Sequence, residues 1–177
     1  MGEYVEMVED CIFDTVIRNG TVVDGSGGSR FKSDIGIKNK RIKAIGDLST
    51  ARSGLKIDAA NRIVAPGFID VHTHDDRVLL AKPTMDMKIS QGVTSVVVGN
   101  CGISLAPLVA DNPPPPLDLI AEAGACRYST FDQFLQEVEG APAAVNAAFL
   151  VGHSTLRVGT MESLDRACLL YTSDAAD

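Results

Sequence analysis

The sequence predicts an α/β fold in two parts: a small N-terminal β part over residues 13–65, then the first three β/α units of an incomplete (β/α)8 barrel over residues 66–167. Three observations predict it. Short β-branched segments separated by turn residues fill the first part. Apolar strands alternate with helical patterns in the second part. The second part also holds fewer than half of the roughly 250 residues that a closed barrel needs.

In the first part, the dipeptides Asn19-Gly20 and Asn39-Lys40 stand where hairpin turns are expected between alternating apolar and polar residues. Hairpins join antiparallel neighbours. We therefore expect a small antiparallel sheet here, as part of a β-sandwich, preceded by a lead-in of residues 1–12.

Beyond Pro66 the apolar segments lose their alternation, which is typical of parallel strands buried on both faces. A helical pattern covers residues 85–91. The predicted strands are Phe68–Val71, Thr94–Val98 and Ala147–Gly152.

The clearest predicted helix begins after Thr130, which can cap it with Gln133 three residues on, and ends at Gly140. Its apolar stripe consists of Phe131, Phe134, Leu135 and Val138. Before this helix, four consecutive prolines, Pro113–Pro116, favour an extended, stiff excursion. A loop of that length is functional or disordered in most compact domains.

A net charge of −7 argues against nucleic acid or an anionic membrane as a partner. The N-terminus, MGEYVEMVED, lacks a basic and apolar leader, so we expect a cytoplasmic protein. The four cysteines have no paired spacing that would indicate a disulfide framework.

The short second part has two consequences for the chain. An incomplete barrel leaves an open sheet edge and uncovered apolar surface, so we expect the 177-residue chain to be marginally stable or prone to aggregate. The last ten residues, CLLYTSDAAD, do not continue the preceding pattern, and we interpret residues 168–177 as a non-native tail.

His72 and His74 are candidate metal ligands, and they lie at the end of a strand predicted to be buried. Residues two apart on a strand share a face, with Cα atoms roughly 6.5 Å apart, so both imidazoles can reach one metal ion. The C-terminal ends of barrel strands are where active sites form. A pair of surface or capping histidines is the alternative.

Cys101 follows the second strand in the sequence Gly99-Asn100-Cys101-Gly102, whose glycines permit a tight turn. Its position favours metal ligation, although a lone cysteine is more often a small buried apolar residue.

His153 and Arg157 follow the third strand. His153 is a candidate to line the site or to lie beneath a loop. Arg157 is a candidate to hold a substrate carboxylate or to form a surface ion pair. Asp75 and Asp76 are candidates to support an imidazole N–H or to be simply solvated.

The motifs IVAPGFIDVHTHDDR, ISQGVTSVVVGNCGISLAPL and VGHSTLR, with IRNGTVVDGSG and the proline-rich insertion, resemble the N-acyl-D-amino-acid deacylases (D-aminoacylases) of the amidohydrolase superfamily. The resemblance covers about Phe13 to Ala167. The first motif marks only the superfamily, which includes hydantoinases and dihydroorotases with a metal-bridging carboxylated lysine. GNCGIS is the discriminating motif.

This resemblance implies a TIM-like, metal-dependent hydrolase barrel that uses zinc to hydrolyse an N-acyl-D-amino acid to a carboxylate and a D-amino acid. Cys101 would be a metal ligand, and His72 and His74 would supply a second, weakly occupied position. The catalytic aspartate and the remaining ligands come from later strands and match no residue here, so we expect the chain by itself to be inactive. A cyclic-amide hydrolase and a non-catalytic fragment remain the alternatives.

Overall fold

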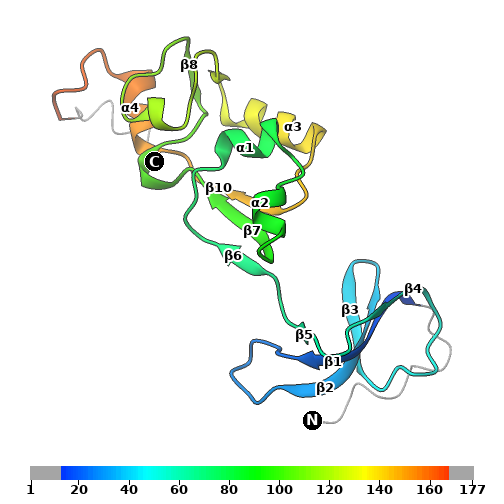
Figure 1. Cartoon of the computed structure of the whole chain (residues 1–177). Helices are drawn as coiled ribbons and strands as arrows, with labels where there is room; N and C mark the ends of the chain where they lie inside the picture. The colour runs from blue at the N-terminus through cyan, green and yellow to red at the C-terminus, as the bar shows by residue number, and fades with distance from the viewer. Residues whose placement is uncertain (1–12, 168–177) are drawn as a thin grey trace. The chain divides into compact units, whose positions relative to one another are not determined.

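The computed structural model describes residues 13–167, so the predicted lead-in and the predicted tail lie outside the described residues. The chain divides into two compact units, Met1–Pro66 and Gly67–Asp177 (Figure 1). In the described part of the chain, no helix has both the length and the apolar character that crossing a membrane requires.

The first unit is one mixed five-stranded sheet, drawn in blue to green in Figure 1. Strand β1 pairs antiparallel with β2, and β2 with β3, but β1 pairs parallel with both β4 and β5. The purely antiparallel prediction is therefore wrong, and the sandwich is not confirmed, because these strands form a single sheet. The strands are β1 (Phe13–Val22), β2 (Phe31–Lys38), β3 (Arg41–Gly46), β4 (Ser53–Asp58) and β5 (Ile63–Val64).

Of the two predicted turns, only the second is a turn. Asn39 and Lys40 take left-handed φ values of 52° and 60° between β2 and β3, as a two-residue hairpin requires. Asn19 instead lies in a bulge inside β1, with φ 62°. Its backbone N–H donates to Asp34 and its side-chain amide to Asp58, each at 2.9 Å, so flanking segments hold it without reversing the chain.

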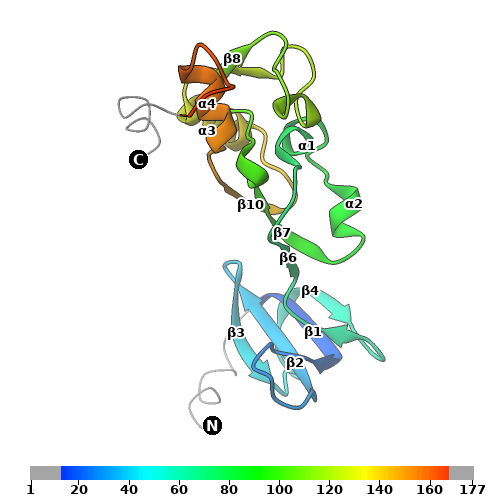
Figure 2. The ribbon, with the colours of Figure 1, turned by 90° about the vertical axis from the view of Figure 1, so that its left-hand side faces the viewer.

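The second unit, whose strands are labelled in Figure 2, has a parallel three-stranded sheet of order β10-β7-β6. Its strands are β6 (Phe68–Asp70), β7 (Val93–Val98) and β10 (Asn146–Phe149). The predicted strand Thr94–Val98 is confirmed as β7. The third strand ends earlier than predicted, because Gly152 already serves as the N-cap of the next helix.

The prediction of a buried first strand in this unit is wrong. Among the described residues β6 pairs only with β7, so it is an edge strand, and Phe68, Ile69 and Val71 are 63–67% exposed. In the central β7, by contrast, Val96 and Val98 are each 1% exposed. Burial of a parallel strand requires cover on both faces, and β6 lacks it here.

Four α-helices accompany the sheet in the described residues: α1 (Asp76–Ala81), α2 (Asp86–Ile89), α3 (Phe131–Gly140) and α4 (His153–Thr160). Helix α3 matches its prediction, and the Thr130 side chain accepts a hydrogen bond from the Gln133 N–H at 3.3 Å. Helix α2 begins one residue later than predicted, because Met85 has a left-handed conformation, and it ends two residues earlier, shortly before Gly92 with its positive φ of 80°. Leu79 of α1 packs with Met85 against β7.

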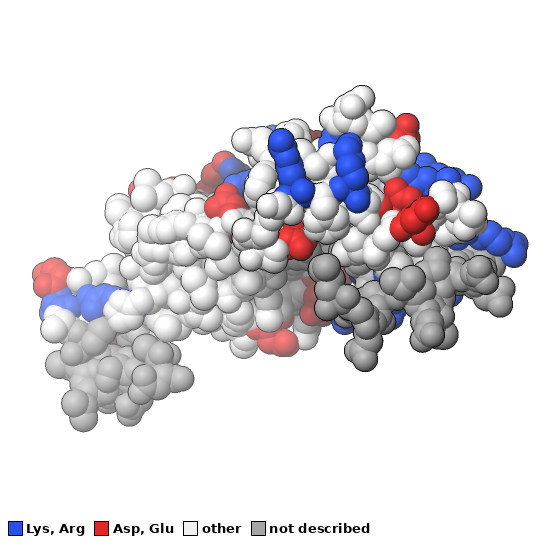
Figure 3. All heavy atoms as spheres, turned by 90° about the horizontal axis from the view of Figure 1, so that it is seen from below, with Lys and Arg blue, Asp and Glu red and all other residues white. Residues whose placement is uncertain are grey.

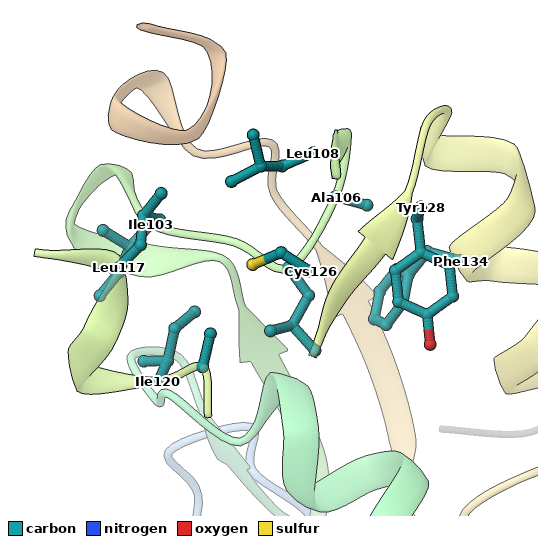
Figure 4. Close-up of a cluster of buried hydrophobic side chains, with 10 residues drawn as sticks. Ile103, Ala106, Leu108, Leu117, Ile120, Cys126, Tyr128 and Phe134 are labelled. Carbon is teal, nitrogen blue, oxygen red and sulfur yellow. The ribbon is translucent and has the colours of Figure 1, made fainter. Parts of the chain in front are cut away.

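The proline-rich segment folds into a packed substructure, which corrects the prediction of an extended excursion (Figure 4). Strands β8 (Leu108–Ala110) and β9 (Cys126–Tyr128) pair antiparallel, and the 3-10 turn η2 (Leu117–Leu119) follows the prolines. The apolar residues that flank the prolines drive this packing, because their burial removes them from water. The cluster consists of Ile103, Leu105, Ala106, Leu108, Leu117, Ile120, Ala121, Cys126, Tyr128 and Phe134.

Candidate metal centre

Three donor side chains meet where β6 and β7 end. His72 and His74 lie in the loop after β6, and Cys101 lies in the 3-10 turn η1 (Asn100–Gly102) after β7. Because β6 and β7 are parallel neighbours, their C-terminal ends share one sheet edge. One nitrogen of each imidazole and the Cys101 Sγ all lie within 4.8 Å of one another.

The separations of these atoms are near those of ligands that share one zinc ion. Nitrogen and sulfur ligands around a tetrahedral zinc are about 3.3–3.6 Å apart, given its bond lengths. The His72 Nε2 to Cys101 Sγ distance is 3.1 Å. The two imidazole rings have centroids 5.8 Å apart and an interplanar angle of 73°, so they present edges rather than stacked faces. Imidazoles and a thiolate are the donors that zinc prefers, and all three side chains are exposed to an incoming ion.

The backbone of the turn places the thiol. Gly99, Cys101 and Gly102 all have positive φ, at 80°, 55° and 75°. A Cβ on Gly99 would lie 2.0 Å from the backbone oxygen of Leu150, so close approach to the end of β10 also requires glycine there. Cys101 is the one residue of this turn that carries a side chain in the left-handed region.

Asn100 joins the two ligand loops. Its side-chain amide donates to the Val97 carbonyl at 2.7 Å and to the Thr73 carbonyl at 3.3 Å. The Thr73 N–H donates to the same Val97 carbonyl at 3.2 Å. Residue 73 lies between the two histidines, so these bonds fix their loop relative to the cysteine turn.

Asp76 is a second link between the loops, buried to 1% exposure at the start of α1. Its carboxylate accepts a hydrogen bond from the Gly99 N–H at 3.4 Å. Burial raises the pKa of Asp76 above its ordinary value, and the Gly99 N–H and the nearby His74 oppose that rise. Of the two candidate acids, Asp76 is therefore not a solvated surface group.

Lys88 in α2 contacts both ends of the histidine loop. Its ammonium group is 2.7 Å from Asp70 Oδ2 and 2.9 Å from Asp75 Oδ2. The hydrogen bond from Lys88 is the main cause that holds the pKa of Asp70 below its ordinary value. Burial by itself lowers the pKa of Lys88, but the bonds to both carboxylates outweigh it and the net direction is upward.

His153 and Arg157 do not join the three-residue cluster. His153 is the exposed first residue of α4, and its backbone nitrogen lies 3.8 Å from where a Cβ on Gly102 would be, beside the cysteine turn. The Arg157 guanidinium donates to the backbone carbonyls of Leu164 and Arg166 at 3.0 and 2.9 Å. It is therefore already engaged within the chain.

Three further residues support the site although the sequence alone assigns them no role: Asn100, Lys88 and Thr155. The buried Thr155 hydroxyl accepts a hydrogen bond from the Ser104 N–H at 2.8 Å, which ties α4 to the segment after the cysteine turn. The position of Asn100 between Gly99 and Gly102 could have indicated a role in the cysteine turn. For Lys88 and Thr155, no local pattern indicates a partner so distant along the chain.

Known proteins are similar to this chain in sequence and in fold. The family described as "Amidohydrolase family" matches residues 56–167, and "Urease alpha-subunit, N-terminal domain" matches residues 1–64. A D-aminoacylase of Alcaligenes xylosoxydans xylosoxydans is 54% identical over 155 residues, covering 88% of this chain and 32% of that protein.

Two solved structures are similar over most of this chain. A crystal structure of D-aminoacylase matches with a TM-score of 0.89 and 50% identity, and covers 92% of this chain and 34% of that one. An N-acyl-D-glutamate deacylase from Bordetella bronchiseptica, complexed with zinc and a phosphonate inhibitor, matches with a TM-score of 0.86 and 38% identity over the same shares.

The chain thus spans about a third of the length of the relatives that it matches. The predicted resemblance to the N-acyl-D-amino-acid deacylases is confirmed by these relatives, whose names and identities single them out. The match over residues 56–167 covers more than half of the chain. The chain belongs to the amidohydrolase family.

Proposed function

We propose that this chain supplies His72, His74 and Cys101 to the zinc centre of an enzyme that hydrolyses N-acyl-D-amino acids to a carboxylate and a D-amino acid. The observation that carries the proposal is the convergence of two imidazoles and one thiol from adjacent loops to within 4.8 Å. Relatives named D-aminoacylase and N-acyl-D-aspartate deacylase, 54% and 49% identical, support the choice of substrate class.

The fold proposal is that β6, β7 and β10 with their helices are the first three β/α units of a TIM-like barrel. Its support is the parallel order of the three strands and the position of the donor atoms after their C-terminal ends. That end of such a barrel is where catalytic residues collect.

When bound, zinc supplies Lewis acidity: it polarises the amide carbonyl and lowers the pKa of water toward neutrality. The residues of this chain hold and orient the donors. The two histidines project from one loop, and the left-handed turn at Cys101 presents the thiol to them. We assign no acid-base residue among the described residues. That role belongs to an aspartate from a later strand.

His153 is proposed to contact substrate beside the centre, because α4 begins next to the cysteine turn. Arg157 remains a weaker candidate to bind a substrate carboxylate, since its guanidinium would have to leave the carbonyls of Leu164 and Arg166.

A chimera tests the proposed activity. Residues 13–167 replace the matching segment of the Alcaligenes D-aminoacylase, and turnover of N-acetyl-D-amino acids is compared with turnover of hydantoins. We expect the linear amides to be hydrolysed and the cyclic ones not. Cys101→Ala should lower kcat/KM at least about 100-fold, because loss of a metal ligand removes several kcal/mol of transition-state stabilisation.

Cys126→Ala is the control, because Cys126 lies in the apolar cluster and not in the metal centre. A chimera that prefers hydantoins, or one in which Cys101→Ala leaves zinc content and turnover intact, would contradict the proposal. The 177-residue chain alone is expected to show no turnover, and zinc-dependent hydrolysis by it would contradict the assignment of the acid-base group to a later strand.

A further inference from the structure

We propose that Lys88 is a positioning residue for the metal centre, because it clamps both ends of the loop that carries His72 and His74. The inference rests on the proposed zinc site. Lys88 itself is not a ligand: it acts through Asp70 and Asp75, which flank the two histidines in the chain.

The contacts of the Lys88 ammonium use its full donor capacity. It donates to Asp70 Oδ2 at 2.7 Å and to Thr73 Oγ1 at 3.3 Å, and pairs with Asp75 Oδ2 at 2.9 Å. An ammonium has three N–H donors, and each finds one acceptor here. The side chain is 17% exposed, so solvent screens these contacts less than it screens a surface ion pair.

The carboxylates that Lys88 contacts are themselves hydrogen-bonded to the loop that carries the two histidines. The other carboxylate oxygen of Asp70 accepts from the His72 N–H at 3.3 Å, and Asp75 Oδ2 accepts from the Thr73 hydroxyl at 2.6 Å. One of these bonds therefore holds the backbone of His72, and the other holds Thr73, which lies between the two histidines. The imidazoles themselves are exposed, so packing does little to restrict them.

If Lys88 restricts the conformation of this loop, the chain should bind the metal ion more tightly with Lys88 than without it. A loop already held in its binding conformation loses less conformational entropy when the ion binds. Removal of groups that orient metal ligands typically weakens metal binding 10–100-fold. A structural role elsewhere in the unit would leave the affinity unchanged.

The test compares Lys88→Met with Lys82→Met in the full 177-residue chain. Lys82 is an exposed lysine of the same unit. Zinc affinity is measured by competition with a chromogenic chelator. The chain has three histidines, so imidazole proton–carbon NMR spectra of the metal-free chain report His72 and His74, with His153 as internal reference. Lys88→Met should weaken zinc binding about 10-fold or more. It should also shift two of the three imidazole signals, whereas Lys82→Met changes neither.

Unmoved histidine signals in Lys88→Met would overturn the proposal. If Lys88→Met unfolds, as seen by circular dichroism, Lys88→Gln replaces it. This variant is shorter, uncharged and has two N–H donors in place of three, so it cannot hold Asp70, Thr73 and Asp75 together. Wild-type histidine signals in Lys88→Gln would likewise overturn the proposal. A wild-type chain that binds no zinc contradicts the proposed metal centre, and the metal-free spectra still decide the role of Lys88.

Discussion

At residue 99 the backbone requires glycine for two separate reasons. Its φ is 80°, and the space that a Cβ would fill is taken by the Leu150 backbone oxygen. The second reason couples the cysteine turn to the end of β10, because the turn can approach that strand only without a side chain. The position of the Cys101 thiol therefore depends on a residue that has no side chain of its own.

Gly99→Ala is expected to lower the free energy of unfolding of the second unit by about 3 kcal/mol or more. A left-handed residue with a Cβ costs about 1–2 kcal/mol, and the contact with Leu150 adds backbone strain. Urea denaturation followed by circular dichroism measures the change. Gly124→Ala is the matched control: φ there is 76° with nothing within 4 Å of the added carbon, so only the first cost applies. Equal losses in the two variants would contradict the packing argument.

Among individual residues, the sequence predicted the three candidate metal ligands but not the residues that hold their loops in place. His72 and His74 are two apart after a strand, and Cys101 lies between turn glycines, so short-range patterns indicate all three. Lys88 and Asn100 act on residues 13–27 positions away, and such partners follow only from the fold. Asp76 looked like a loop acid in the sequence, yet it is buried where α1 begins.

At the scale of elements, α3 shows which elements the sequence can predict. Its start is signalled by Thr130, its core face by the stripe around Phe134, and its end by Gly140, and all of these signals lie within eleven residues. The parallel pairing of β1 with β4 has no such local signal, since Thr15 pairs with Leu55. The exposure of β6 likewise depends on which strands lie beside it.

Thr130→Ala is expected to destabilise the second unit by about 1 kcal/mol, because the Gln133 N–H loses its acceptor at the helix start. Chemical denaturation measures the loss. Thr130→Ser keeps the hydroxyl and should retain most of the wild-type stability. If the serine variant is as unstable as the alanine variant, the hydrogen bond is not the cause.

At the scale of the whole molecule, both units expose large apolar side chains. In the first, Ile42 and Leu55 are 60% and 54% exposed, and in the second, Phe68 and Ile69 of β6 are 65% and 63% exposed. The face drawn in Figure 3 carries interspersed acidic and basic side chains, with broad areas of neither. Such surface and an unpaired strand edge promote association.

We expect the 177-residue chain to self-associate at micromolar concentrations, with sedimentation coefficients that rise with concentration. Replacing Ile69 and Val71 by serine should reduce this association, because both lie at the edge strand. Val109→Ser removes a side chain of similar exposure from β8 and should have a smaller effect. A wild-type chain that sediments as a single species at all concentrations would contradict this expectation.

If His72, His74 and Cys101 form one metal centre, a cobalt titration of the metal-free chain should reveal it. Cobalt(II) takes the same donors as zinc, and a thiolate ligand adds an intense near-ultraviolet charge-transfer band. We expect this band to saturate at one equivalent in the wild type and in Cys126→Ala, and to be lost in Cys101→Ala. A band that persists in Cys101→Ala, or no band in the wild type, would contradict it.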